Sequence, residues 1–146
     1  MQYYLFPDTA AQLSRVMTEA MAPAFVLAAV ASLVSTLLGR MTAVVERIRN
    51  LNDISDDDKS RAHLKLDVPR LRRRAKLLEN AAYLALFSGM CTALLLVTGF
   101  ICAYLRLEHV YGVAVLFVLA VVLLGAALFR FAQEVRIGLA DADHYR

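Results

Sequence analysis

Three long apolar stretches dominate the pattern of hydrophobic and polar positions along the chain. They cover residues 20–39, 81–105 and 111–129. A helix needs roughly 20 residues to cross a hydrocarbon core about 30 Å thick, and each stretch meets that length. The pattern therefore predicts an all-α membrane protein with three transmembrane helices.

A shorter amphipathic segment precedes the first stretch. Over residues 8–19, Leu13, Val16 and Met17 share one helical face, while Arg15 and Glu19 are spaced as an i,i+4 ion pair. This segment predicts a short interfacial helix on the outer side of the membrane. Pro23 follows, and its ring disfavours an unbroken hydrogen-bond ladder, so the next helix is expected to begin or kink there.

Apolar residues continue at heptad spacing past the end of the first span. The first series steps by 4 and 3 through Val30, Val34, Leu37, Met41, Val44, Ile48 and Leu51. A second series with the same steps leads back into the second span: Leu64, Val68, Leu71, Ala75, Leu78, Ala82, Ala85 and Gly89. Paired antiparallel, the two series predict a coiled-coil-like hairpin over about residues 40–80, extending spans one and two on the cytoplasmic side.

Two signals within the hairpin suggest where its second arm begins. Pro69 suits the first turn of a helix, and Asp67 could cap a helix that starts there. Residues 55–58 have capping-box character and predict a separate short helix. Nothing along residues 1–146 divides the chain, so a single membrane domain is expected.

A second stripe on the first helix is small or polar. Its members are Ala28, Ser32, Ser35, Thr36, Gly39, Glu46 and Arg49. Small residues let membrane helices approach closely, so one interpretation is helix packing within or between protomers. The other treats the stripe as the lining of an oligomeric pore, with Glu19 and Arg40 as charged rings. Glu19 and Arg40 also fit as ordinary interfacial anchors.

Charge fixes the expected orientation. The composition is 60% hydrophobic with a mean hydropathy of +0.56, and the charges are concentrated outside the apolar stretches. The region between spans one and two holds eleven cations, whereas the opposite side offers only Arg15 and Arg106. Lys and Arg are retained on the cytoplasmic side, so the N-terminus is predicted outside and the C-terminus inside.

No catalytic, cofactor or metal site is expected. The acidic run from Asp53 to Asp58 lacks the glycine and glutamate that a calcium-binding loop requires. Cys91 and Cys102 lie on one predicted helix, about 16 Å apart along its axis, and are interpreted as packing residues. His63 and His109 have no partners at ligand or triad spacing. The chain is therefore not expected to be an enzyme.

A basic cluster precedes the second span. Arg72, Arg73 and Arg74 lie where anionic headgroups attract cations by about 1 kcal/mol each. Lipid headgroup contact is therefore preferred to nucleic-acid binding, and the expected partner is a bilayer with anionic lipids.

Several segments resemble a known family. They are Met21-Ala22-Pro23-Ala24, Gly39-Arg40, Val45-Glu46-Arg47-Ile48-Arg49, and Arg72-Arg73-Arg74-Ala75-Lys76-Leu77-Leu78. Together they resemble the bacterial membrane proteins filed as domain of unknown function 2721, with similarity from about Leu13 to Phe131. The resemblance implies a protein of the bacterial inner membrane, and it implies neither an activity nor residue roles.

Two functions remain open from the sequence. Three helices bury little surface alone, and the first helix has two faces that favour contact, so a homo-oligomer is predicted. The first hypothesis is a small oligomeric channel or pore-like protein with the first span central and the third facing lipid. The alternative is a non-catalytic accessory or scaffold subunit of a larger membrane complex.

Overall fold

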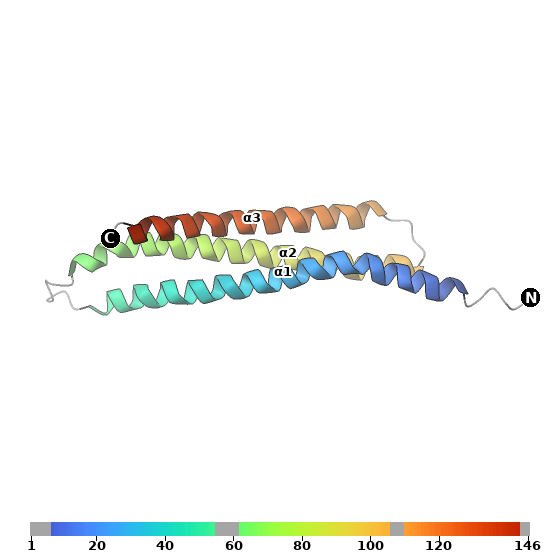
Figure 1. Ribbon diagram of the computed structural model, residues 1–146, viewed down its shortest axis with the longest axis horizontal. Coiled ribbons are helices and arrows are strands. Elements are labelled where there is room, and N and C mark those ends of the chain that lie inside the picture. The colour runs from blue at the N-terminus through green and yellow to red at the C-terminus, as the bar shows by residue number, and fades with distance from the viewer. Residues whose placement is uncertain (1–6, 55–61, 106–109, 144–146) are drawn as a thin grey trace, which may run out of the picture.

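The computed structural model describes residues 7–54, 62–105 and 110–143. These residues form α1 (Pro7–Asn52), the short 3-10 helix η1 (Ala62–Asp67), α2 (Val68–Leu105) and α3 (Val110–Asp143). Figure 1 shows the three long helices side by side, with each running opposite to the one before it. Within the described residues, three helices are long and apolar enough to cross a membrane. The predicted all-α class with three such helices is confirmed.

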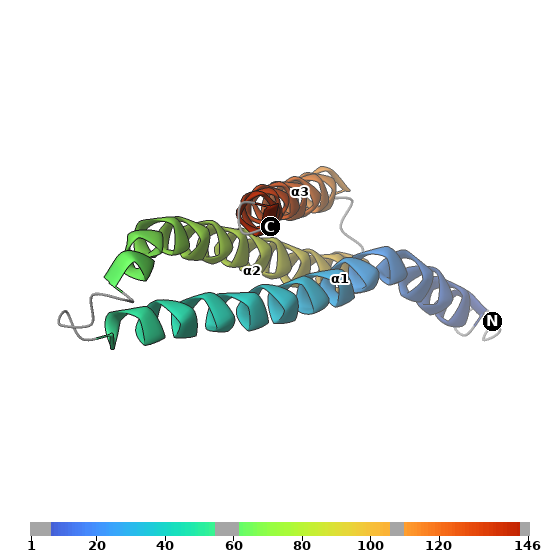
Figure 2. The ribbon, with the colours of Figure 1, turned by 60° about the vertical axis from the view of Figure 1, so that its left-hand side comes forward.

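Helix α1 is continuous where two elements were expected. The predicted interfacial helix over residues 8–19 and the first span both belong to the single 46-residue helix Pro7–Asn52, with Pro23 inside it. An internal proline removes one hydrogen bond and bends a helix without necessarily ending it. Figure 2 shows that α1 changes direction in its N-terminal part, drawn in blue. The expectation that a helix begins at Pro23 is therefore wrong, because α1 continues through this residue.

Helix α2 lies between the other two helices. It packs against both α1 and α3, whereas α1 and α3 have few direct contacts with each other. The two heptad series meet at the α1–α2 contact. The buried cluster there includes Leu33, Leu37, Val44, Leu71, Leu78, Ala82 and Ala85, with Val34, Met41, Ile48, Leu51 and Ala75 packed against it.

Glycine and small residues bring these helices close together. A Cβ added at Gly89 would lie 3.2 Å from Cγ1 of Val30, so this glycine permits a close approach of α2 to α1. On the other face of α2, Ser88 Oγ donates a 2.7 Å hydrogen bond to the Ala120 carbonyl of α3. Thr92 donates at 2.8 Å to the Ser88 carbonyl. Small residues and buried hydroxyls of this kind are typical of packed membrane helices.

Helices α2 and α3 extend beyond the predicted spans. Helix α2 begins at Val68, next to Pro69, and α3 continues to Asp143 rather than ending near residue 129. The C-terminal part of α3 lies along the early part of α2 (Figure 1), so the region expected to be a two-helix hairpin also contains α3. Residues 55–58, where a separate short helix was predicted to begin, lie outside the described residues.

Candidate functional site

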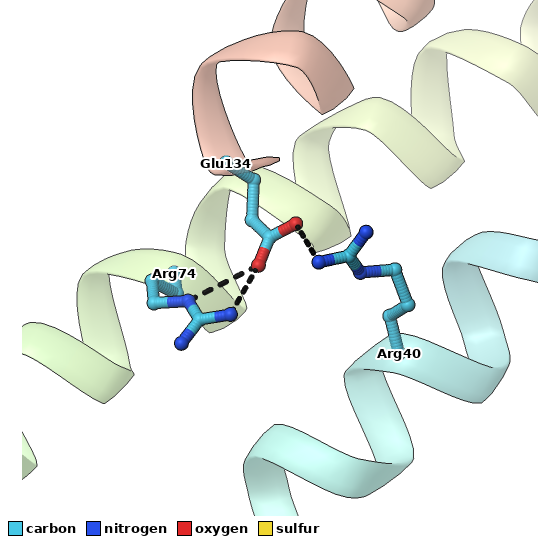
Figure 3. A network of polar contacts seen from close by, with 3 residues as sticks. All are labelled: Arg40, Arg74 and Glu134. Carbon is cyan, nitrogen blue, oxygen red and sulfur yellow. Dashed lines mark hydrogen bonds and ion pairs between the residues drawn. The ribbon is translucent and has the colours of Figure 1, made fainter. Parts of the chain in front are cut away.

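Three charged side chains, one from each long helix, meet at a single point. Glu134 of α3 accepts two hydrogen bonds at Oε1 from Arg74 of α2, one from Nε at 3.1 Å and one from Nη2 at 2.8 Å. Its other oxygen, Oε2, lies 3.3 Å from Nη2 of Arg40 on α1. Figure 3 shows the two guanidinium groups approaching the carboxylate from opposite sides. We call Arg40, Arg74 and Glu134 the three-helix ion cluster.

Glu134 follows two alanines at the same heptad position of α3. Ala120, Ala127 and Glu134 follow one another at intervals of seven residues, and each has 0% exposure. This spacing places them on the same face of the helix, toward α2. Burying a carboxylate is costly unless it is paired. Glu134 can be buried at this position because the two arginines pair with it.

Neighbouring residues hold both arginines in place. The Arg40 guanidinium carbon lies 5.3 Å from the centre of the Phe131 ring, within the range of a cation–π interaction. A Cβ added at Gly138 would lie 2.8 Å from Nη2 of Arg74, so the absence of a side chain there makes room for that guanidinium. Both Phe131 and Gly138 belong to α3, within four residues of Glu134 in the sequence.

The cluster carries excess positive charge. Two guanidinium groups face one carboxylate, which leaves a net charge of +1. Glu134 Oε2 is buried and accepts no hydrogen bond from the described residues. The Arg40 side chain is 39% exposed and that of Arg74 is 18% exposed. Arginine does not give up its proton in proteins, so both guanidiniums keep the positive charge with which they can hold an anion.

The three arginines of the predicted basic cluster differ in their surroundings. Arg72 and Arg73 are exposed, as lipid contact requires, whereas Arg74 points inward to Glu134. Of the two predicted charged rings, Arg40 pairs with Glu134. Glu19 pairs with Arg15 at 3.1 Å, and both of those side chains are largely exposed.

The small and polar stripe of α1 faces away from α2. Every predicted member is exposed: Ala28, Ser32, Ser35, Thr36, Gly39, Glu46 and Arg49. A Cβ at Gly39 would meet nothing within 4 Å. Thr36 donates a 3.0 Å hydrogen bond to the Ser32 carbonyl of its own helix. The stripe is thus a free surface of the single chain.

An apolar cavity of about 380 Å³ lies near the opposite end of the bundle from the ion cluster. All three helices contribute to its wall, including Pro23 of α1, Phe100 of α2 and Phe117 of α3. Among the described residues, no group of three or more metal-ligating side chains is present. Cys91 and Cys102 are free thiols, each half-buried.

Comparison with protein families matches residues 20–143 to the family described as "Protein of unknown function (DUF2721)". The chain belongs to this family. The resemblance inferred from the proline in the first span and the arginine-rich return helix is thereby confirmed. The matched region contains the whole three-helix ion cluster. No curated protein and no solved structure matches the chain.

Glu134 is the residue of this DUF2721 member that sequence reasoning missed. Its partners are 60 and 94 positions away, and no local motif joins them. The available signal was the series Ala120, Ala127 and Glu134, in which an acidic residue takes the place of alanine on a packing face. A charge at such a position indicates a partner inside the bundle.

Proposed function

We propose that the protein is a small integral membrane protein that assembles into a homo-oligomer around α1, forming a channel or pore-like structure. The observation that supports this proposal is the free face of α1, where small and polar residues run along a helix with span-like length and hydropathy. Polar groups in a membrane helix favour contact with another helix or with water over contact with lipid.

The serines of the stripe support a central position for α1. The hydroxyls of Ser32 and Ser35 make no hydrogen bond to another described residue, and both side chains are exposed. In an oligomer these hydroxyls would meet a neighbouring copy of α1 or water in a pore. By contrast, the exposed side chains of α3 include Val115, Val118, Val122 and Phe129, which suit contact with lipid.

A second candidate, an accessory or scaffold subunit of a larger membrane complex, draws on a different observation. The hydroxyl of Thr36 in the stripe and that of Thr42, farther along the same helix and also exposed, donate hydrogen bonds to carbonyls of α1 itself, at 3.0 and 2.9 Å. A threonine satisfied in this way tolerates an apolar neighbour. The same stripe could therefore pack against a helix of another protein, with no water-filled pore.

The proposed membrane is the bacterial inner membrane, with the N-terminus periplasmic and the C-terminus cytoplasmic. The basis is the distribution of Lys and Arg, most of which lie between the first two spans. In this orientation the three-helix ion cluster lies at the cytoplasmic interface, because Arg40 directly follows the predicted first span.

Mass and cross-linking test the assembly. The detergent-solubilised protein should have the mass of an oligomer. In a background where Cys91 and Cys102 are replaced by alanine, Ser35→Cys should form covalent dimers with a bifunctional maleimide. Val122→Cys on the lipid-facing side of α3 is the matched control and should remain monomeric. A monomeric mass together with unlinked Ser35→Cys would exclude self-assembly.

Ion flux then separates the two candidates. Protein in liposomes should conduct ions, and Ser35→Leu or Gly39→Leu should reduce the flux by about tenfold or more because the added side chains narrow the pore. Val122→Leu should leave the flux unchanged. An absence of flux, with the native protein co-purifying in a larger complex, would favour the accessory subunit.

A further inference from the structure

We propose that Arg40 and Arg74 form a binding site for the phosphate group of an anionic ligand, beside the Glu134 carboxylate that both guanidiniums contact. The site is the three-helix ion cluster, and its chemistry is that of a phosphodiester or phosphate held by arginine. This inference does not depend on whether the protein forms a pore.

The charge balance of the cluster favours an additional anion. The single carboxylate of Glu134 faces two guanidinium groups, so one positive charge stays uncompensated beside a buried group. An unpaired charge at a partly desolvated site is unfavourable, and an anion that binds there neutralises it. Among the described residues, Glu134 is the only acidic partner of both arginines.

The hydrogen-bond donors are also incompletely used. Among the described residues, Arg40 approaches Glu134 through Nη2 alone and otherwise lies over the face of the Phe131 ring. A guanidinium carries five N–H donors in a planar fork that matches two oxygens of a phosphate. With 39% of its side chain exposed, Arg40 can present the rest of this fork to an external ligand.

The cluster lies close to the predicted ends of two membrane spans. Arg40 follows the predicted first span directly, and Glu134 lies five residues beyond the predicted third span. Phosphate groups of lipids lie at this depth of a bilayer, where basic pockets between helices bind anionic headgroups. Soluble phosphate would reach the same groups from the aqueous side, so the experiment distinguishes the two sources.

The first test compares two arginines of the same helix. Native mass spectrometry of the purified protein would measure the retention of phosphatidylglycerol. Arg40→Gln should weaken retention by about tenfold, equivalent to about 1.4 kcal/mol. Arg47→Gln removes the same charge from an exposed position of α1 and should leave retention within about twofold of the wild type. Equal retention by both variants would overturn the proposal.

The second test separates ligand binding from a purely structural role. Arg40→Gln and Glu134→Gln both break the Arg40–Glu134 pair, but they change the charge of the cluster in opposite directions. Retention by monodisperse Glu134→Gln should equal or exceed that of the wild type, because both guanidiniums remain. Loss of retention in both variants would show that the cluster only holds the helices together. The Arg40 and Arg47 comparison stands even if Glu134→Gln does not fold.

The third test identifies the source of the phosphate. Excess inorganic phosphate should leave phosphatidylglycerol bound if the lipid is the preferred ligand, and should displace it if the site prefers free phosphate. Either result supports a phosphate site, provided that Arg40→Gln retains less phosphatidylglycerol than the wild type. Retention of zwitterionic phosphatidylcholine as strong as that of phosphatidylglycerol, and insensitive to Arg40→Gln, would contradict it.

Discussion

Glu134 places a carboxylate on a helix face where the two preceding heptad positions hold alanine. Ion pairs in such surroundings contribute little net stability, since desolvation offsets most of the Coulomb attraction. Their main effect is on geometry, because the carboxylate can be buried only when Arg40 and Arg74 are both within reach. We therefore interpret the cluster as fixing the register of α3 against the other helices.

A substitution at Gly138 tests whether the Arg74 guanidinium is held in this place by the packing of α3 on α2. Alanine at this position would put its Cβ 2.8 Å from Nη2 of Arg74, which is itself held at 2.8 Å from Glu134. At Gly125 of the same helix, a Cβ meets nothing within 4 Å. Both substitutions gain helix propensity, by up to about 1 kcal/mol. Gly138→Ala should nevertheless be less stable than Gly125→Ala by about 1 kcal/mol, because Arg74 must shift.

Chemical denaturation in detergent micelles, followed by circular dichroism, would measure the difference. Equal stabilisation by both alanines would show that Arg74 moves aside without cost, and the contact at Gly138 would then have no role in placing the guanidinium.

At the scale of helices, the parts that sequence predicted well are those set by local periodicity. The heptad series containing Leu37 and Leu78 identified the α1–α2 contact, because repeating apolar residues must find a partner face. The series did not reveal the second packing face of α2, where Ser88 donates a hydrogen bond to α3. That face is small and weakly polar, so hydropathy does not distinguish it from a surface exposed to solvent.

Leu37 and Leu38 allow the predicted contact to be tested by neighbouring substitutions. Leu37 has 0% exposure inside the α1–α2 core, while Leu38 is 52% exposed. Leu37→Ala should cost about 2 to 4 kcal/mol through lost contacts and a residual cavity, whereas Leu38→Ala should cost less than about 0.5 kcal/mol. Thermal unfolding in the same detergent would report both, and similar costs would mean that α1 is not packed on α2 as described.

At the scale of the whole molecule, the predicted orientation across a membrane can be tested by labelling the two ends of α1. Ser14 and Asn52 lie near opposite ends of α1, and both are exposed. With Cys91 and Cys102 replaced by alanine, Ser14→Cys should react with an impermeant maleimide added to intact spheroplasts. Asn52→Cys should react only in inverted vesicles, because its end of the helix carries the flanking cations. The reverse pattern of labelling would contradict the predicted topology.

The central place of α2 has a mechanical consequence. Helices α1 and α3 are each fastened along α2 but have few contacts with each other. The pairing of Arg40 with Glu134, supported by Phe131, ties them directly. A displacement of the Asn52 end of α1 is therefore transmitted to α3 mainly through α2 and through the Arg40–Glu134 ion pair. Helix α2 therefore carries most of the contacts that hold the bundle together, and the Arg40–Glu134 pair links the two outer helices near one end.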